Sequence, residues 1–104
     1  MTSGHTYLWE FTVKPDHLEE FRRQYGPEGP WVALFRKAPG YLETLLLQDR
    51  ANPLRFITVD RWESVEAQRS FRSAFAREYA ELDVRCAHLT AQEVSLGDFD
   101  EAIV

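Results

Sequence analysis

Three side chains on the short segment 56–62 are the best candidates for chemistry in this chain. Thr58, Asp60 and Trp62 share one parity of an alternating pattern, so in a strand they lie on the same face and could share one cavity. An Asp60 carboxylate beside aromatic surface would resist ionisation and could act as a general base. Thr58 would add a hydroxyl to the same face. The Trp62 ring would wall a pocket, and its N–H would donate to a substrate oxygen.

Each of these catalytic assignments has a structural alternative. A Trp at a strand end also plugs the seam between sheet and helix, so Trp62 could serve packing alone. Asp60 is followed by Arg61 and could be solvated or act as a cap. Other aromatic side chains are expected to line a pocket for a flat hydrophobic ligand, to fill the core, or to do both, with the two on the second helix as a lid. These residues are Trp9, Phe11, Trp31, Phe35, Phe56, Phe71, Phe75 and Tyr79.

Hydrophobic periodicity predicts the elements that would position these residues. Period-two alternation predicts strands over 7–13, 41–48, 56–62 and, more weakly, 90–101. Helical spacing with Pro and Gly boundaries predicts helices over 15–25 and 30–38. A long helix is predicted from Ser64 to about His88, bent near Arg77, with Ser64 accepting a hydrogen bond from its first amides.

This order of elements predicts an α+β fold, a ferredoxin-like βαββαβ sandwich with a four-stranded antiparallel sheet and helices on one face. The strands carry apolar residues on both faces, and helices can cover only one of them. A second copy of the same sheet is the simplest cover for the other face, so a twofold homodimer is expected. One face is expected to carry Leu8, Leu42, Leu46, Ile57 and Val59, and the other Trp9, Phe11, Phe56 and Trp62.

Length and composition limit the classes of protein that fit. A chain of 104 residues suits one domain, here 1–104. A formal charge of −5 argues against nucleic acid or anionic lipid as partners. The sequence has neither an apolar run long enough to span a membrane nor a signal-peptide pattern. The single Cys86 excludes an internal disulfide and favours a reducing cytoplasm.

Metal and cofactor signatures are weak. His5, His17 and His88 are far apart in the sequence, and Cys86 and His88 would point in different directions on a helix. His17 and Glu20 have i,i+3 spacing and would share a metal only if further ligands arrived from elsewhere, so no metal site is expected. No Ser-His-Asp ordering, Gly-rich phosphate loop or dinucleotide fingerprint occurs, and no cofactor is expected.

Two segments carry a family resemblance, "KAPGYLETLLLQD" and "FITVDRWESVEAQRSF", together with the order of elements over nearly the whole chain. The sequence resembles the antibiotic biosynthesis monooxygenase-like (ABM) proteins of the dimeric α+β barrel superfamily. The resemblance implies cofactor-free oxygenation of a small flat aromatic substrate of the phenol or quinol type. In that reaction Trp62 would orient the substrate, Thr58 would donate or relay a proton, and Asp60 or water would be the base. Quinone-forming members have an Asn on the third strand, a Trp at its end and a Tyr on the following helix. Aligned through "RWES", these positions are Thr58, Trp62 and Gln68 here.

Because one of the three positions matches, two functional classes remain open. The chain is either a cofactor-independent monooxygenase-like enzyme or a non-catalytic protein that binds a small hydrophobic ligand or a partner on the same scaffold. The haem-degrading branch resembles the chain less. It has a Trp and a His on the second helix, where the alignment places Phe71 and Glu81. His88 lies two turns further on, so haem binding is not expected.

Overall fold

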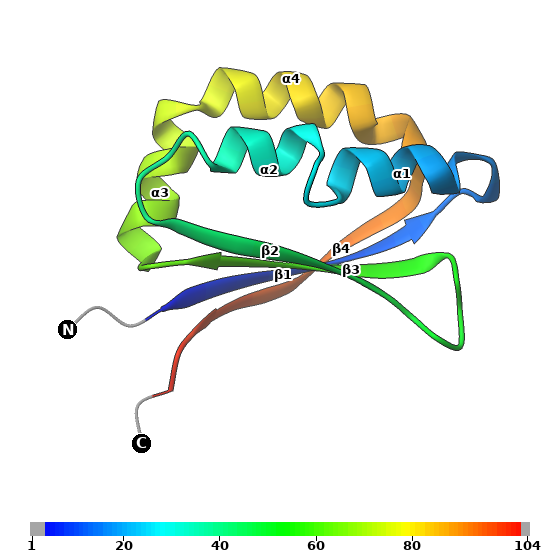
Figure 1. Cartoon of the computed structure of the whole chain (residues 1–104), viewed down its shortest axis with the longest axis horizontal. Helices are drawn as coiled ribbons and strands as arrows, with labels where there is room; N and C mark the ends of the chain where they lie inside the picture. Colours follow the sequence, from blue (N-terminus) through cyan, green and yellow to red (C-terminus); the bar gives the residue numbers. More distant parts are fainter. Residues whose placement is uncertain (1–3, 103–104) are drawn as a thin grey trace.

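Four antiparallel strands form one sheet, and the helices lie together on one of its faces (Figure 1). The computed structural model describes residues 4–102. The strand order is β2-β3-β1-β4, which is the ferredoxin-like arrangement, so the predicted α+β sandwich is confirmed. The elements are β1 (His5–Val13), η1 (Pro15–His17), α1 (Leu18–Tyr25), α2 (Pro30–Phe35), β2 (Tyr41–Gln48), β3 (Arg55–Trp62), α3 (Val65–Ala74), α4 (Ala76–Cys86), η2 (Ala87–Leu89) and β4 (Thr90–Asp100).

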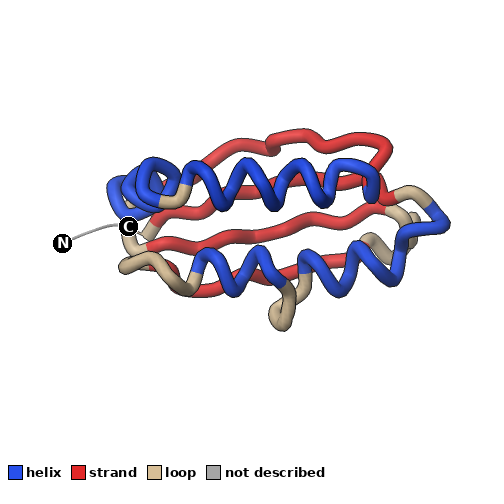
Figure 2. The backbone as a smooth tube through the Cα atoms, turned by 90° about the horizontal axis from the view of Figure 1, so that it is seen from above, coloured by secondary structure: helices blue, strands red, loops and turns tan. Residues whose placement is uncertain are grey.

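Seen from above, the helices form two rows along the sheet (Figure 2). One row contains α1 and α2, and the other contains α4, with α3 at its end. The first predicted helix begins with the 3₁₀ turn η1, and Phe21 and Tyr25 are the buried residues of α1. The two rows and the sheet enclose an aromatic core between them.

The start of the third helix is confirmed, but its length is not. Ser64 accepts a hydrogen bond of 3.1 Å from the amide of Ala67, as expected of an N-cap. The predicted helix is divided in two, because Phe75 leaves helical geometry (φ −115°) and separates α3 from α4, two residues before the bend expected near Arg77. Its aromatic residues step by four, and each such step drifts about 40° around a helix of 3.6 residues per turn. The break at Phe75 lets α4 turn Tyr79 back toward the core, which it contacts.

The faces of β2 also differ from the expectation. Tyr41 pairs with Trp62 and Glu43 with Arg61, so Leu42 is the extra residue of a bulge. Every residue after the bulge changes face relative to simple alternation. The prediction that Leu46 lies on the outer face with Leu42 is therefore wrong. Leu46 lies opposite Thr58 instead and packs against the core.

The outer face of the sheet carries a large apolar surface, and no described element covers it (Figure 1). The bulge turns Leu45 and Leu47 to this face, where they pair with Val59 and Ile57. Large exposed side chains on β2 and β4 are Leu42, Leu45, Leu47, Val94, Leu96 and Phe99. Compared with the sequence pattern, this face gains Leu45 and Leu47 and loses Leu46.

Candidate functional site

A cavity of about 230 Å³ lies between the inner face of the sheet and the helices. It is smaller than the roughly 300–1,000 Å³ of pockets that take drug-sized ligands. Six aromatic side chains give it flat apolar walls, and six polar or charged side chains complete it. The lining residues are Trp9, Phe11, Tyr25, Trp31, Phe35, Thr44, Thr58, Asp60, Arg72, Tyr79, Asp83 and Glu93. Such a lining suits a small flat molecule with one or two polar groups.

Strand β3 places Thr58 and Asp60 on the cavity wall. They alternate with Val59, so both point to the helix-covered face, as the sequence pattern predicts. Thr58 is buried, opposite Trp9 of β1 and Leu46 of β2. The strand therefore presents a hydroxyl and a carboxyl to the same small space.

The Asp60 carboxyl has a raised pKa. It is partly buried, and this desolvation raises the pKa of its carboxyl from 3.8 to about 6. A hydrogen bond of 2.8 Å from the Thr44 hydroxyl acts in the opposite direction and holds the pKa down. A pKa of about 6 leaves the group ionised near neutral pH, yet basic enough to take a proton.

Tyr41 extends this contact into a hydrogen-bonded chain. The Thr44 hydroxyl has one proton, which it donates to Asp60, so it accepts from the Tyr41 hydroxyl, 2.7 Å away. Burial raises the pKa of Tyr41, so it remains a neutral donor near neutral pH. Neither Thr44 nor Tyr41 stands out in the sequence, because simple alternation along β2 gives no sign of the bulge that brings Thr44 to this face.

Arg72 supplies a positive charge to the cavity. Its guanidinium carbon lies 3.9 Å from the ring centroid of Tyr79, a cation–π contact. Burial is the main cause that raises the pKa of Tyr79, and the Arg72 charge partly opposes it. In the sequence Arg72 resembles part of a solvated helix face. The structure keeps Arg72 exposed, as that interpretation expects, and also places it in the cavity lining.

Two more groups on the cavity wall matter for recognition. Trp31 of α2 is buried, and its Nε1–H has no well-aligned hydrogen-bond partner within residues 4–102, although the Tyr25 hydroxyl and the Cys86 thiol are close to it. A buried donor of this kind is available to a ligand oxygen or to an ordered water. Glu93 of β4 has a raised pKa, mainly from desolvation and secondly from the charge of Asp83. The cavity thus has a donor on one wall and carboxylates on another.

Trp62 does not line the cavity. Its side chain is 2% exposed and packs between Tyr41 and Phe71, at ring-centroid distances of 5.3 Å and 5.1 Å. Trp62 therefore packs against Tyr41, the first residue of the hydrogen-bonded chain. Three further aromatic candidates also lie outside the lining, in or against the core: Phe56, Phe71 and Phe75.

The remaining residues that the sequence analysis named either line the cavity or lie outside it. Those that line the cavity are Trp9, Phe11, Trp31, Phe35, Thr58, Asp60 and Tyr79. Gln68 is buried outside the lining and accepts a hydrogen bond of 2.9 Å from the Tyr7 hydroxyl. Glu81 lies on the exposed surface of α4 near Arg77.

The fold and the cavity define a ferredoxin-like α+β protein with an aromatic site between sheet and helices. The family model for antibiotic biosynthesis monooxygenase matches residues 5–82, more than half of the chain. The chain belongs to this family, as its resemblance implied. No curated protein sequence gives a significant match.

Solved structures support the same fold. SnoaB, a cofactor-independent oxygenase from Streptomyces nogalater, is 22% identical with a TM-score of 0.71, over 99% of this chain and 97% of that chain. A protein from Pseudomonas aeruginosa is 19% identical with a TM-score of 0.72, over 99% and 98% of the two chains. At these identities the likeness establishes the fold alone. No helix within residues 4–102 has the length and apolar character needed to cross a membrane.

Proposed function

We propose that this protein is a cofactor-independent monooxygenase that acts on a small flat aromatic substrate of the phenol or quinol type. The observation that carries the proposal is Asp60, a partly buried carboxylate with a pKa of about 6 on the wall of an aromatic cavity. A substrate phenol held there loses its proton to a base whose basicity suits neutral pH. The cavity volume favours one or two fused rings over a larger polycycle.

The chemistry needs only dioxygen as co-reactant. Asp60 takes the phenolic proton, and the electron-rich ring carbon of the resulting anion forms a bond to dioxygen. The resulting peroxide anion takes the proton that Asp60 holds and becomes a hydroperoxide. This hydroperoxide loses its ring C–H proton and cleaves its O–O bond, which leaves a carbonyl oxygen on the ring and releases water. One oxygen atom enters the quinone and the other leaves in water, so the substrate supplies all the electrons. The protein binds, orients and excludes bulk water.

The other polar groups have separate roles in this proposal. Thr44 and Tyr41 set the basicity of Asp60 through their hydrogen bonds. Thr58 donates a proton to the bound oxygen or relays one. The Arg72 charge stabilises the substrate anion. Trp62 acts indirectly, because its ring packs against Tyr41 and positions that side chain.

The second candidate function is binding without catalysis. It is favoured by the two positions at which this chain departs from the quinone-forming pattern, Thr58 and Gln68. Gln68 accepts from Tyr7 and lies outside the cavity lining, so the hydroxyl that the pattern would place there is missing. A binding protein would use the same aromatic walls and the free Trp31 N–H to hold its ligand.

We also propose that the functional unit is a homodimer of one-domain chains in the cytoplasm. The open apolar sheet face supports the dimer, because a patch of this kind on an isolated chain would be exposed to water. The occupant proposed is a second copy of the same face, which gives a closed twofold assembly. A buried free thiol at Cys86 fits a reducing compartment.

Oxygen uptake separates the two functions. The purified protein, free of added flavin or metal, is assayed in an oxygen electrode with a panel of mono- and dihydroxynaphthalenes, and binding is followed in parallel by thermal shift. Oxygen consumption that requires protein and falls in Asp60→Asn supports the enzyme. Ligand-dependent stabilisation without oxygen consumption across the panel would contradict it and support the binder. Thr58→Val and Trp62→Phe proteins with unchanged rates would remove those two residues from the mechanism.

A further inference from the structure

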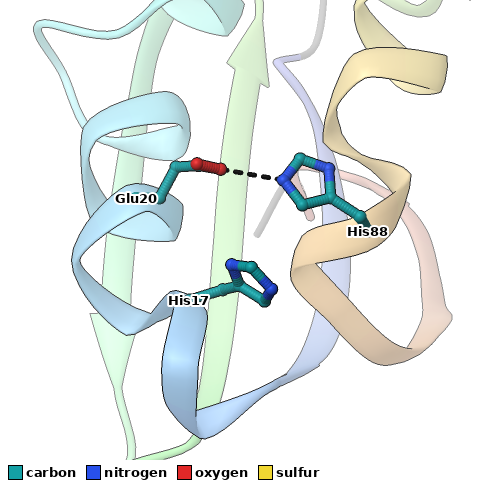
Figure 3. A group of neighbouring side chains, drawn as sticks. All are labelled: His17, Glu20 and His88. Carbon is teal, nitrogen blue, oxygen red and sulfur yellow. Dashed lines mark hydrogen bonds and ion pairs between the residues drawn. The ribbon is translucent and has the colours of Figure 1, made fainter.

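A group of potential metal ligands lies where α1 meets η2 and does not line the aromatic cavity. His17 comes from η1, Glu20 from α1 and His88 from η2. Figure 3 shows the side chains converging from the two sides of this junction. Sequence spacing identifies only the first two residues. The fold supplies His88, which is 68 residues away from Glu20 in the sequence.

The donor atoms are close enough for one ion. One ligand atom from each of His17, Glu20 and His88 lies within 4.8 Å of the other two. His88 Nε2 is 2.8 Å from Glu20 Oε1, and the two imidazole rings meet edge to face at 5.1 Å. Ligands around a tetrahedral zinc ion are about 3.3 Å apart at usual Zn–N and Zn–O lengths, so small side-chain rotations suffice.

The backbone holds the two halves of this group together. The amide of Lys14 donates a 3.0 Å hydrogen bond to the carbonyl of Leu89, and the amide of His17 donates one of 2.9 Å to the carbonyl of Lys14. Leu89 is 1% exposed and anchors η2 in the core. The turns that carry His17 and His88 are therefore linked by the main chain, which reduces the entropy lost when their side chains converge on an ion.

We propose that His17, Glu20 and His88 form a binding site for a divalent transition-metal ion of the zinc type, with water at the fourth position. Two imidazole nitrogens and one carboxylate oxygen match the ligand preference of Zn²⁺ and do not match that of Mg²⁺ or Ca²⁺, which bind oxygen ligands. The three side chains are partly buried or exposed, so an ion has free access. The ion would join η1 and α1 to η2, just before β4, and so stabilise the fold.

This site is separate from the proposed oxygenation, because none of its three residues lines the cavity. The two proposals can fail independently. The metal site predicts Zn²⁺ binding whether or not the protein consumes oxygen. Oxygen uptake by protein treated with a chelator would leave the metal proposal unaffected.

Isothermal titration of the chelator-treated full chain with ZnCl₂ tests the proposal. We expect one ion per chain, and a weakening of at least about tenfold in each of His17→Gln, Glu20→Gln and His88→Gln, because even the loss of a group that only orients a ligand weakens binding by roughly 10–100-fold. Glu19→Gln is the matched control. It removes the same charge one position earlier on α1, where Glu19 is exposed and pairs with Arg22, and it should leave zinc binding unchanged.

Two further measurements test the coordination number and the choice of histidines. Co²⁺ in place of Zn²⁺ should give the visible absorption of a four-coordinate site in the wild type and lose it in Glu20→Gln. Asp98→Asn tests the separate His5 pair, in which His5 Nε2 lies 3.2 Å from Asp98, and should not affect binding. No heat at millimolar ZnCl₂, equal binding in Glu20→Gln and Glu19→Gln, or loss of binding in Asp98→Asn would each overturn the proposal. Circular dichroism confirms that each variant is folded.

Discussion

Thr44 and Asp60 face each other across the β2–β3 pair and are joined by a hydrogen bond of 2.8 Å. Their pairing depends on the bulge at Leu42. Without it, Glu43 would stand opposite Asp60, and two carboxylates would share one face. With it, Glu43 lies opposite Arg61 and forms an ion pair of 2.6 Å on the outer face. One inserted residue therefore replaces a like-charge pair by a hydroxyl–carboxylate pair on the cavity wall.

The first prediction concerns the rate of oxygen uptake in Asp60→Asn. A general base must be ionised, so the wild-type rate should rise with pH through about 6 and then level off. The amide cannot take the proton, and the variant should lose roughly 10²–10⁴-fold in kcat/KM. Steady-state oxygen consumption against pH measures both effects. Asp98→Asn serves as the control, because Asp98 does not line the cavity. An unchanged profile in Asp60→Asn would remove Asp60 from the mechanism.

The second prediction concerns the midpoint of that pH profile in Thr44→Val. The Thr44 hydroxyl lowers the pKa of Asp60, so its removal should raise the pKa and move the rising limb to higher pH. Thr44→Ser keeps a hydroxyl and should keep the wild-type midpoint. Tyr41→Phe removes only the donor to Thr44 and should shift the midpoint less than Thr44→Val does. A midpoint that moves to lower pH in Thr44→Val would contradict the geometry.

The third prediction concerns the stability of Asp60→Asn. The folded-state pKa of Asp60 is raised from 3.8 to about 6, so its stabilising contribution is complete below pH 3.8 and is lost as pH rises through about 6. Asn is neutral at every pH and can still accept from Thr44. The variant should be more stable than the wild type by about 1–3 kcal/mol near neutral pH, since each pKa unit corresponds to about 1.4 kcal/mol and some solvent contact remains. Urea unfolding near neutral pH and below pH 3.8 measures the difference, which should disappear at the lower pH. Equal free energies of unfolding for Asp60→Asn and the wild type at neutral pH would show that ionisation of Asp60 does not destabilise the fold.

The strands and the start of α3 could be predicted from the sequence because their signals are local. Alternation along β1 and β3, and the Ser64 cap, need no tertiary information. The bulge at Leu42 could not, since it is set by how two strands meet, and the break at Phe75 was predicted only as a bend near Arg77. Thr44 was missed because of the bulge, whereas Arg72 was missed because an exposed arginine on a helix gives no sign that it also lines a cavity. Asp60 and Thr58 were found because their strand has no irregularity before them.

The sequence does not predict that His17, Glu20 and His88 converge, because the fold brings them together from separate elements. An i,i+3 pair is visible in the sequence, whereas the third residue is 68 positions away from Glu20 along the chain. Trp62 is the opposite case, a residue that the sequence indicates as part of the site and that does not line the cavity. Its type and parity are those of a ligand-contacting residue, yet the rings of Tyr41 and Phe71 stand beside it and it does not line the cavity.

The fourth prediction concerns Gly40, which joins the turn after α2 to β2. Its φ is +90°, and a Cβ there would lie 2.6 Å from the Cβ of Ala67 on α3. Gly40→Ala should lower the free energy of unfolding by more than the roughly 1–2 kcal/mol that a left-handed conformation costs an L-residue, because the contact adds to it. Gly97→Ala is the comparison, with φ +116° but a nearest contact of 3.3 Å, and should lose less. Adding Ala67→Gly to Gly40→Ala should recover the part of the lost unfolding free energy that is due to the clash. Chemical denaturation of the four proteins measures this, and equal losses in Gly40→Ala and Gly97→Ala would contradict the close packing.

The last prediction concerns the oligomeric state of Leu45→Lys. Leu45 is 45% exposed on the open sheet face, where it pairs with Val59 beside other apolar side chains. If a second copy covers this face, a lysine there places unpaired charge inside the interface on both chains, because a twofold contact repeats every substitution. The variant should be a monomer in sedimentation velocity at concentrations where the wild type is a dimer. Val84→Lys is the matched control, since Val84 is 76% exposed on α4 and lies on the helical side, away from the sheet face. A wild-type monomer at micromolar concentration, or a dimer that Val84→Lys disrupts and Leu45→Lys does not, would show that the sheet face is not the interface.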